Sequence, residues 1–201
     1  YKRQMNDAAA CREAIAAGID VLGENRVQEM TEKLAQGAYE GAPLHFIGHL
    51  QRNKVKQVVG KAALIQSVGS LPLLEAVEKE AEKQGIVQDI LLEVNIGGEA
   101  SKSGISPEEL SALAAQAVGS PHVRLRGLMA IPPVSPEPGA NRPFFAAMRQ
   151  LFVDIKGKMA HNQDDMDCLS MGMSGDYADA IAEGSTLVRV GTALFGPRPP
   201  M

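Results

Sequence analysis

The sequence predicts an α/β protein built as a (β/α)8 barrel, and three observations support this prediction. Helix-period and strand-like segments alternate from one end of the 201 residues to the other. Such alternation is typical of a parallel sheet covered by helices. The strand at 89–96 is continuous in Ile, Leu and Val, as a strand buried on both faces should be. No Gly-x-Gly-x-x-Gly run follows the first strand, which weakens a dinucleotide-binding interpretation.

The first half of the chain supplies four predicted strands and the helices between them. An alanine-rich helix at 7–17 ends at Gly18, and an apolar strand at 19–22 runs into a polar turn. A helix at 26–36, a strand at 44–47, a helix at 52–59 and a strand at 63–68 follow. The helix at 71–83 is stopped by Gly85 before the strand at 89–96.

The second half continues the same alternation. Pro107, with two glutamates behind it, opens a helix that extends to 118. Strands at 123–131, 168–171 and 186–190 then alternate with helices at 141–159 and 177–183. These elements give seven strands in a single domain over 1–201, and an eighth strand before Tyr1 would complete the barrel. The segment 132–142, rich in Pro, Ser and Gly, follows a strand and reads as a surface loop, with a mobile lid as the alternative.

Composition excludes several classes of function. Hydrophobic residues make up 45% and charged residues 22%, which is ordinary for a globular protein. A net charge of −4 argues against nucleic-acid binding, and no apolar run approaches the ~20 residues that cross a bilayer. Cys11 and Cys168 are too few for a disulfide framework, so we expect a reducing, cytoplasmic location and no membrane association.

Polar side chains collect just after the predicted strands. In a parallel barrel these strand ends converge on one mouth, where ligands bind. A single such residue is more often a cap or turn residue, but chance would scatter the group to both ends. The residues in question include Glu24, Asn25, Arg26, His49, Asn53, Asn95, Ser170, Ser174, Arg189 and Thr192.

The last predicted strand carries Arg189 inside a Leu-Val-x-Val run and then breaks into Gly191-Thr192. A charge is costly to bury, so this arginine should have a partner. Gly191 and Thr192 offer backbone N–H groups and a hydroxyl to an anion. Ser174 follows the preceding strand, where an N-cap and a phosphate ligand are about equally good interpretations when it is taken alone. Beside Gly191 the phosphate interpretation gains weight, because the loops after the last two barrel strands are the usual phosphate cradle.

Other catalytic signatures are missing from the sequence. Neither His-Glu-x-x-His nor Cys-x-x-Cys spacing occurs, so no metal site is expected. A Gly-x-Ser-x-Gly elbow and a Walker loop are likewise absent.

Six ordered motifs resemble the YggS/PROSC family of pyridoxal 5′-phosphate (PLP) homeostasis proteins, which are similar in fold to the N-terminal barrel of alanine racemase. They are 23–29 (GENRVQE), 45–54 (HFIGHLQRNK), 99–104 (EASKSG), 126–129 (RGLM), 169–174 (LSMGMS) and 188–192 (VRVGT). The resemblance extends over essentially the whole chain.

This resemblance implies a cofactor site for PLP. Ser174, Gly191 and Thr192 would hold the phosphate, and Arg189 would face the pyridine nitrogen. Asn25 would lie beside the ring, and Met171 and the 45–53 segment would help to line the pocket. The Schiff-base lysine is expected immediately before Tyr1; Lys2 matches the second lysine of that motif and is not its equivalent. Gly69 stands where the family often has Asp, and Gly175 lies in the Met-Ser-x-Asp turn.

The resemblance implies a non-catalytic protein that stores or delivers PLP, with PLP-dependent apoenzymes as possible recipients and a monomer as the expected state. An arginine at the pyridine nitrogen can only donate, so the ring stays a weak electron sink. Racemisation by the related fold uses a second acid/base, a tyrosine from another domain. Tyr1, Tyr39 and Tyr177 lie in segments predicted to be helical or terminal. The alternatives are a PLP-dependent amino-acid racemase and a barrel that binds another phosphorylated metabolite.

Overall fold

A seven-stranded parallel sheet forms the centre of the molecule. The structure is a computed structural model that describes residues 7–99, 102–135, 137–159 and 164–196. Neighbouring strands pair in chain order from β1 to β7, which confirms the predicted parallel barrel-type architecture. The strands are β1 (Leu22–Glu24), β2 (Leu44–Phe46), β3 (Leu64–Val68), β4 (Gln88–Glu93), β5 (Val123–Met129), β6 (Cys168–Met173) and β7 (Leu187–Arg189).

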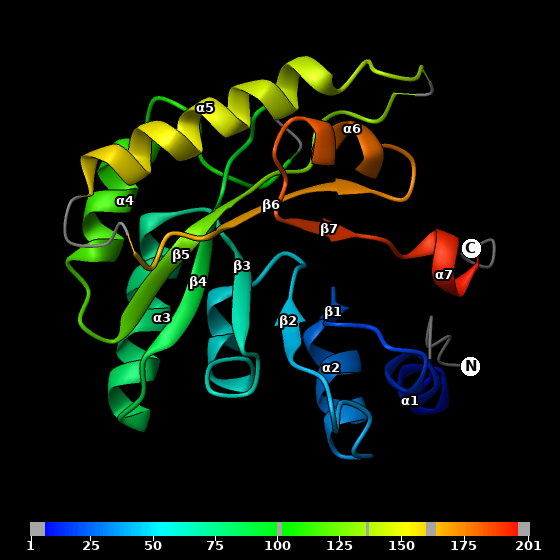
Figure 1. The fold of residues 1–201 in the computed structure, drawn as a ribbon. Coiled ribbons are helices and arrows are strands. Elements are labelled where there is room, and N and C mark those ends of the chain that lie inside the picture. The colour runs from blue at the N-terminus through cyan, green and yellow to red at the C-terminus, as the bar shows by residue number, and fades with distance from the viewer. Residues whose placement is uncertain (1–6, 100–101, 136, 160–163, 197–201) are drawn as a thin grey trace.

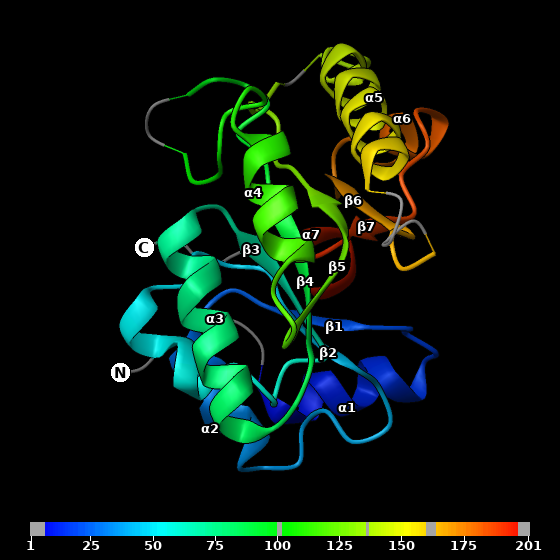
Figure 2. The same ribbon diagram turned by 90° about the vertical axis from the view of Figure 1, so that its left-hand side faces the viewer.

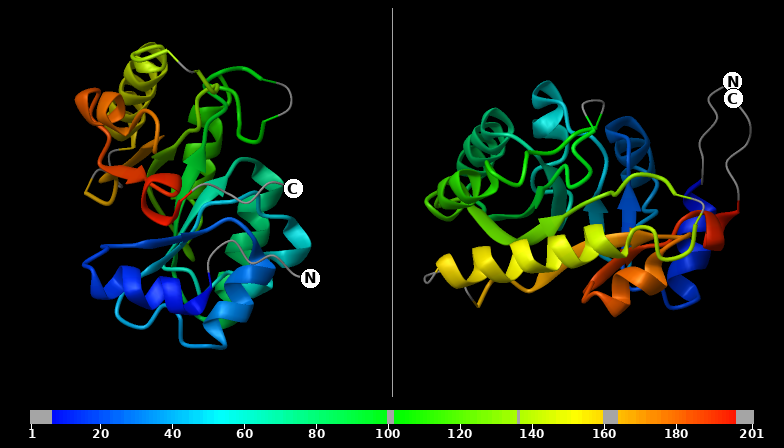
Figure 3. Two further views of the ribbon diagram at one scale, coloured as in Figure 1. Left: turned by 90° about the vertical axis from the view of Figure 1, so that its right-hand side faces the viewer. Right: turned by 90° about the horizontal axis from the view of Figure 1, so that it is seen from above.

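The sheet curls so that its first and last strands lie on the same side of the molecule (Figures 1 and 2). Within the described residues, no ladder pairs β7 with β1. The curled sheet is therefore nearly a barrel but is not closed by hydrogen bonds between these two strands. Figure 3 shows the helices on the outside of this curled sheet. They are α1 (Ala8–Ala16), α2 (Val27–Leu34), the 3-10 helix η1 (Arg52–Gln57), α3 (Leu71–Gln84), α4 (Leu110–Val118), α5 (Arg142–Lys158), α6 (Tyr177–Ala182) and α7 (Thr192–Phe195).

Some predicted boundaries are wrong. The first strand is Leu22–Glu24 rather than 19–22, because the ladder to β2 starts only where Leu22 pairs with Leu44. The helix expected at 107–118 begins at Leu110, after a turn. The short helix α7 lies in a segment for which the sequence predicted only a turn after the last strand.

Two apolar layers explain why the strands are buried on both faces. The larger core cluster lies between sheet and helices and includes Phe46, Ile90 and Phe145. A smaller cluster of Leu64, Leu91 and Met129, with Cys168 packed against it, lies on the other face of the strands. Successive strand side chains alternate between faces, so Glu93 shares the inner face with Leu91.

Ion pairs close the amino-terminal end of the barrel interior. Arg126 donates to Asp167 from Nε at 3.0 Å and from Nη2 at 2.5 Å, and to Asp89 Oδ2 from Nη1 at 2.8 Å. Arg124 Nε donates to the other oxygen of Asp89 at 2.7 Å. These charged residues lie at the amino-terminal ends of β4 and β5 and just before β6.

Gly48 allows the exits of β1 and β2 to approach each other. A Cβ added at Gly48 would lie 2.0 Å from the carbonyl oxygen of Asn25. That distance is far below van der Waals contact, and the obstacle is backbone rather than a flexible side chain. The close approach brings Asn25 and His49 to one opening.

Candidate ligand site at the carboxyl ends of the strands

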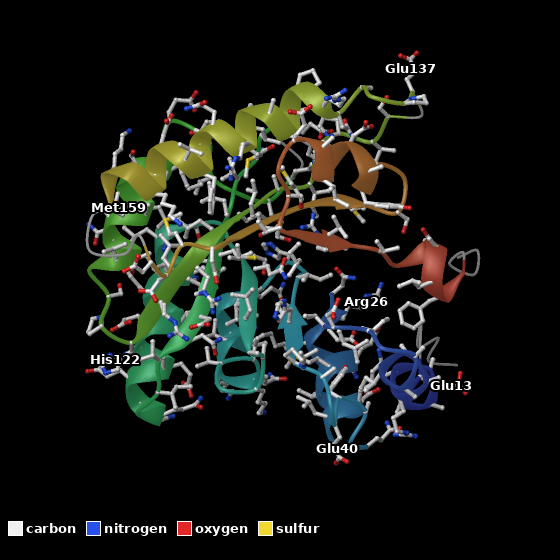
Figure 4. The ribbon with its side chains drawn as sticks, viewed as in Figure 1. Glu13, Arg26, Glu40, His122, Glu137 and Met159 are labelled. Carbon is white, nitrogen blue, oxygen red and sulfur yellow. The ribbon has the colours of Figure 1, made fainter. Side chains whose placement is uncertain are left out.

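A cavity of about 270 Å³ opens at the carboxyl ends of β1, β2 and β4. Its polar lining residues are Asn25, His49, Glu93, Asn95, Lys102 and Ser103. In Figure 4, Arg26, which follows β1, lies near this end, whereas Glu40 and His122, which precede β2 and β5, mark the opposite end. Of the polar residues expected at one mouth, Asn25, His49 and Asn95 line this cavity, whereas Glu24 is buried against Lys33 and Tyr39. A second cavity of about 620 Å³ lies at the amino-terminal ends of β2 to β4.

Arg189 points into the barrel. The residue is 9% exposed, and its guanidinium donates from Nη2 to the carbonyl oxygen of Ala130 at 2.8 Å, and from Nη1 to Ser170 Oγ. Burial lowers the pKa of Arg189 to about 10, while nearby Glu93 opposes that shift. The group therefore stays charged at neutral pH. The partner that a buried arginine needs is supplied by a serine hydroxyl and a backbone carbonyl.

Ser174, Gly191 and Ala193 form a small cluster of polar groups, the cup, at the exits of β6 and β7, of the kind that binds anions. The Ser174 hydroxyl accepts from the backbone N–H groups of Gly191 at 3.2 Å and Ala193 at 3.4 Å. A Cβ added at Gly175 or Gly191 would meet nothing within 4 Å, so the space around the cup is open. Thr192 is exposed and begins α7 beside these donors.

Asp176 holds the turn that carries Ser174. Its Oδ1 accepts from the Met173 N–H at 2.7 Å, and its Oδ2 accepts from Asn141 Nδ2 at 2.7 Å. Asp176 occupies the N-cap position of α6, but its side chain makes no capping hydrogen bond there. The carboxylate therefore shapes the turn before the helix instead of capping it.

The remaining predicted residues differ in their placement. Asn25 is exposed and lines the cavity. Met171 is fully buried in the core cluster between sheet and helices, so the structure does not bring it to the mouth. Neighbouring Ser170 takes the inner face of β6, and strand alternation turns Met171 away. Lys2 lies outside the described residues, and the position expected for the Schiff-base lysine is not part of the printed sequence.

Gly69 has a local structural explanation. A Cβ at this position would lie 2.8 Å from the Cα of Gly104, which has a φ of +104°. The two backbones pass too closely for the aspartate that the family often has at this position. Ser103, next to Gly104, is held by His49, whose Nδ1 lies 2.9 Å from the serine hydroxyl.

Glu93 and Gln66 were missed as site residues, and His45 was included only as one end of the 45–53 segment. Glu93 faces the cavity from the end of β4, and its burial raises its pKa to about 7, although the charge of Arg189 lowers it. His45 is 8% exposed, and its burial, followed by the charge of Arg126, lowers its pKa to about 4. The signal available in the sequence was a polar residue inside each strand. Such a residue needs a partner on the inner face.

Glu93 and His45 predict opposite pH dependences of stability. Between pH 4.5 and 7 the folded state holds a proton on Glu93 that the unfolded state has released, so the free energy of unfolding falls as pH rises. Between pH 4 and 6.5 the unfolded state protonates His45 and the folded state does not, so the free energy of unfolding rises with pH.

We therefore expect Glu93→Gln, measured relative to the parent protein, to gain about 1.4 kcal/mol of stability per pH unit across its window. His45→Gln should lose stability relative to the parent by a similar amount per unit as pH rises. Urea denaturation at half-unit steps measures both differences. If the free energies of unfolding of both variants, each relative to the parent, changed in the same direction as pH rises, one of these two groups would not be buried.

Comparisons with known proteins agree with this geometry. The fold and the mouth define a (β/α)-barrel protein with a polar cavity at the strand exits, and the family model "Alanine racemase, N-terminal domain" matches residues 3–199. Alanine racemase of Clostridium difficile shares the fold with a TM-score of 0.76 at 15% identity, covering 96% of this chain and 49% of the racemase.

More similar proteins give the family. The pyridoxal phosphate homeostasis protein of Aquifex aeolicus is 44% identical over 93% of this chain and 81% of its own length. That of Pseudomonas aeruginosa is 43% identical over 95% of this chain and 80% of its own. PipY of Synechococcus elongatus, solved with PLP bound, has a TM-score of 0.85 at 35% identity and covers 95% of this chain and 88% of PipY. The chain belongs to the family of pyridoxal phosphate homeostasis proteins.

Proposed function

We propose that this protein binds PLP at the mouth of the barrel and serves in intracellular PLP homeostasis by storing and delivering the cofactor, without catalytic turnover. The proposal rests on two neighbouring features. The guanidinium of Arg189 points into the barrel, and Gly191, two residues later in the chain, donates to Ser174 in the cup. The names of the relatives and the PLP-bound structure of PipY support the same ligand.

The donor set fits a phosphorylated pyridine. The backbone N–H groups of Gly191 and Ala193 converge on the Ser174 hydroxyl next to open space, and Thr192 lies between them in the chain, a cluster that suits a phosphate monoester. Arg189 would donate to the ring nitrogen, and Asn25 would contact the ring. Bound PLP supplies an electrophilic aldehyde that reacts with amines.

Arg189 also argues for storage over catalysis. A guanidinium has no acceptor, and its two hydrogen bonds inside the barrel fix it as a donor. The ring nitrogen facing it would therefore stay unprotonated, which disfavours carbanion formation. Of the tyrosines in the described residues, Tyr39 is buried against Glu24 and Tyr177 begins α6, so neither lines the cavity.

Two measurements test the proposal. Equilibrium dialysis should show saturable PLP binding that inorganic phosphate weakens by competition. Incubation of the PLP-loaded protein with L-alanine in D₂O should leave the α-proton unexchanged over hours. Rapid exchange would replace the proposal with the racemase alternative, and failure to retain PLP would favour a different phosphorylated ligand.

Cytoplasmic location, a monomeric state and delivery to PLP-dependent apoenzymes are further parts of this proposal. Both cysteines are free, which suits a reducing compartment. Of the helices formed by the described residues, none has the length and hydropathy needed to cross a membrane.

A further inference from the structure

Four buried side chains form a continuous hydrogen-bonded chain across the barrel interior, from β7 to β2. Arg189 Nη1 donates to Ser170 Oγ, Ser170 Oγ donates to Gln66 Oε1 at 2.7 Å, and Gln66 Nε2 lies 2.9 Å from His45 Nδ1. All four side chains are buried, with Ser170 at 0% and Gln66 at 1% exposure. The chain thus leads from the buried guanidinium of Arg189 across the barrel interior.

The hydrogen bonds of this chain run in one direction, away from Arg189. A guanidinium has no acceptor, so Ser170 Oγ accepts from Arg189, and its own hydrogen goes to Gln66 Oε1. The carboxamide then presents its NH₂ group to His45, whose Nδ1 must carry a lone pair. His45 is accordingly the neutral Nε2–H tautomer, and the lowering of its pKa to about 4 agrees with this assignment.

We propose that Gln66 is a positioning residue that fixes the orientation of Arg189 through Ser170, so that the guanidinium presents its remaining N–H groups to the ring nitrogen of PLP. This inference rests on the proposed function. Gln66 does not touch the ligand in this scheme. Its carbonyl receives the Ser170 hydrogen, and without that acceptor the hydroxyl can rotate and its lone pair no longer points steadily at Arg189.

Gln88 provides a matched control for a merely structural effect. It is also a buried glutamine, 3% exposed, at the start of β4. Its Nε2 donates to the Ala62 carbonyl at 3.0 Å and its Oε1 accepts from the Gly60 N–H at 2.9 Å. These contacts lie at the amino-terminal end of the barrel, so Gln88→Met removes comparable bonds without reaching Arg189.

The test compares two ligands across four proteins. Dissociation constants are measured for PLP and for its 1-deaza analogue, in which a C–H group replaces the ring nitrogen. The parent protein, Gln88→Met and Gln66→Glu should share one preference for PLP over the analogue. Glutamate at position 66 keeps an oxygen that accepts from Ser170, so it should rescue the orientation. Gln66→Met should lose about five- to tenfold of that preference.

An unchanged preference in Gln66→Met, or an equal loss in Gln88→Met, would overturn the inference. A parent protein that binds both ligands equally would overturn it as well, whereas a parent that binds neither would overturn the proposed function instead. Should Gln66→Met fail to fold, ¹⁵N NMR of the parent still decides the direction of the chain. His45 must show an unprotonated Nδ1 and a protonated Nε2, and the other tautomer would overturn the inference.

Discussion

Replacing Lys33 with methionine is expected to lower the free energy of unfolding by about 3–5 kcal/mol, because it leaves a buried carboxylate without its counter-ion. Lys33 is 3% exposed and Glu24 is 6% exposed, and Nζ lies 2.5 Å from Glu24 Oε1. The Tyr39 hydroxyl donates to the same oxygen at 2.8 Å but carries no charge. Urea denaturation of the purified variant measures the loss.

Two further variants interpret the Lys33 result. Lys79→Met, at an exposed position on α3, should change the free energy of unfolding by less than about 0.5 kcal/mol. Adding Glu24→Gln to Lys33→Met removes the stranded charge and should recover part of the loss. A loss below about 1 kcal/mol in Lys33→Met alone would mean that the pair is solvated rather than buried.

Replacing Arg189 with methionine is expected to weaken PLP binding by about 10- to 100-fold, the equivalent of one lost charged hydrogen bond. The same change removes the guanidinium that donates to the Ser170 hydroxyl and to the Ala130 carbonyl. It should also raise the pKa of Glu93 above its present value of about 7, because the charge of Arg189 lowers that pKa. Equilibrium dialysis and ¹³C NMR titration of the Glu93 carboxyl measure the two effects.

Arg189→Lys separates charge from geometry. A lysine keeps the positive charge near Glu93 but loses the planar fork that holds Ser170 and Ala130 together. We therefore expect the pKa of Glu93 to stay at about 7 while PLP binding still weakens. Arg149→Met, an exposed position on α5 where the guanidinium lies over Phe152, serves as the control and should bind PLP normally. Unchanged PLP affinity in Arg189→Met would remove Arg189 from the site.

Much of the candidate site was predictable because its residues follow strands. Arg189 stood out as a charge inside an apolar run, and Ser174, Gly191 and Asn25 follow strand ends. Met171 misled for a physical reason. Both faces of these strands are buried, so composition alone did not say whether Met171 or Ser170 points into the barrel.

The alternation of apolar segments and caps in the sequence was enough to determine the seven described strands and their order, and it predicts the end of the barrel at which a ligand would bind. Tertiary structure alone decided how the interior charges are satisfied. Gln66 comes from β3, Ser170 from β6 and His45 from β2. Glu24 of β1 contacts Lys33 of α2 and Tyr39, which follows that helix. These partners are brought together by the curl of the sheet and by side-chain reach, and neither is encoded in the periodicity of any single segment.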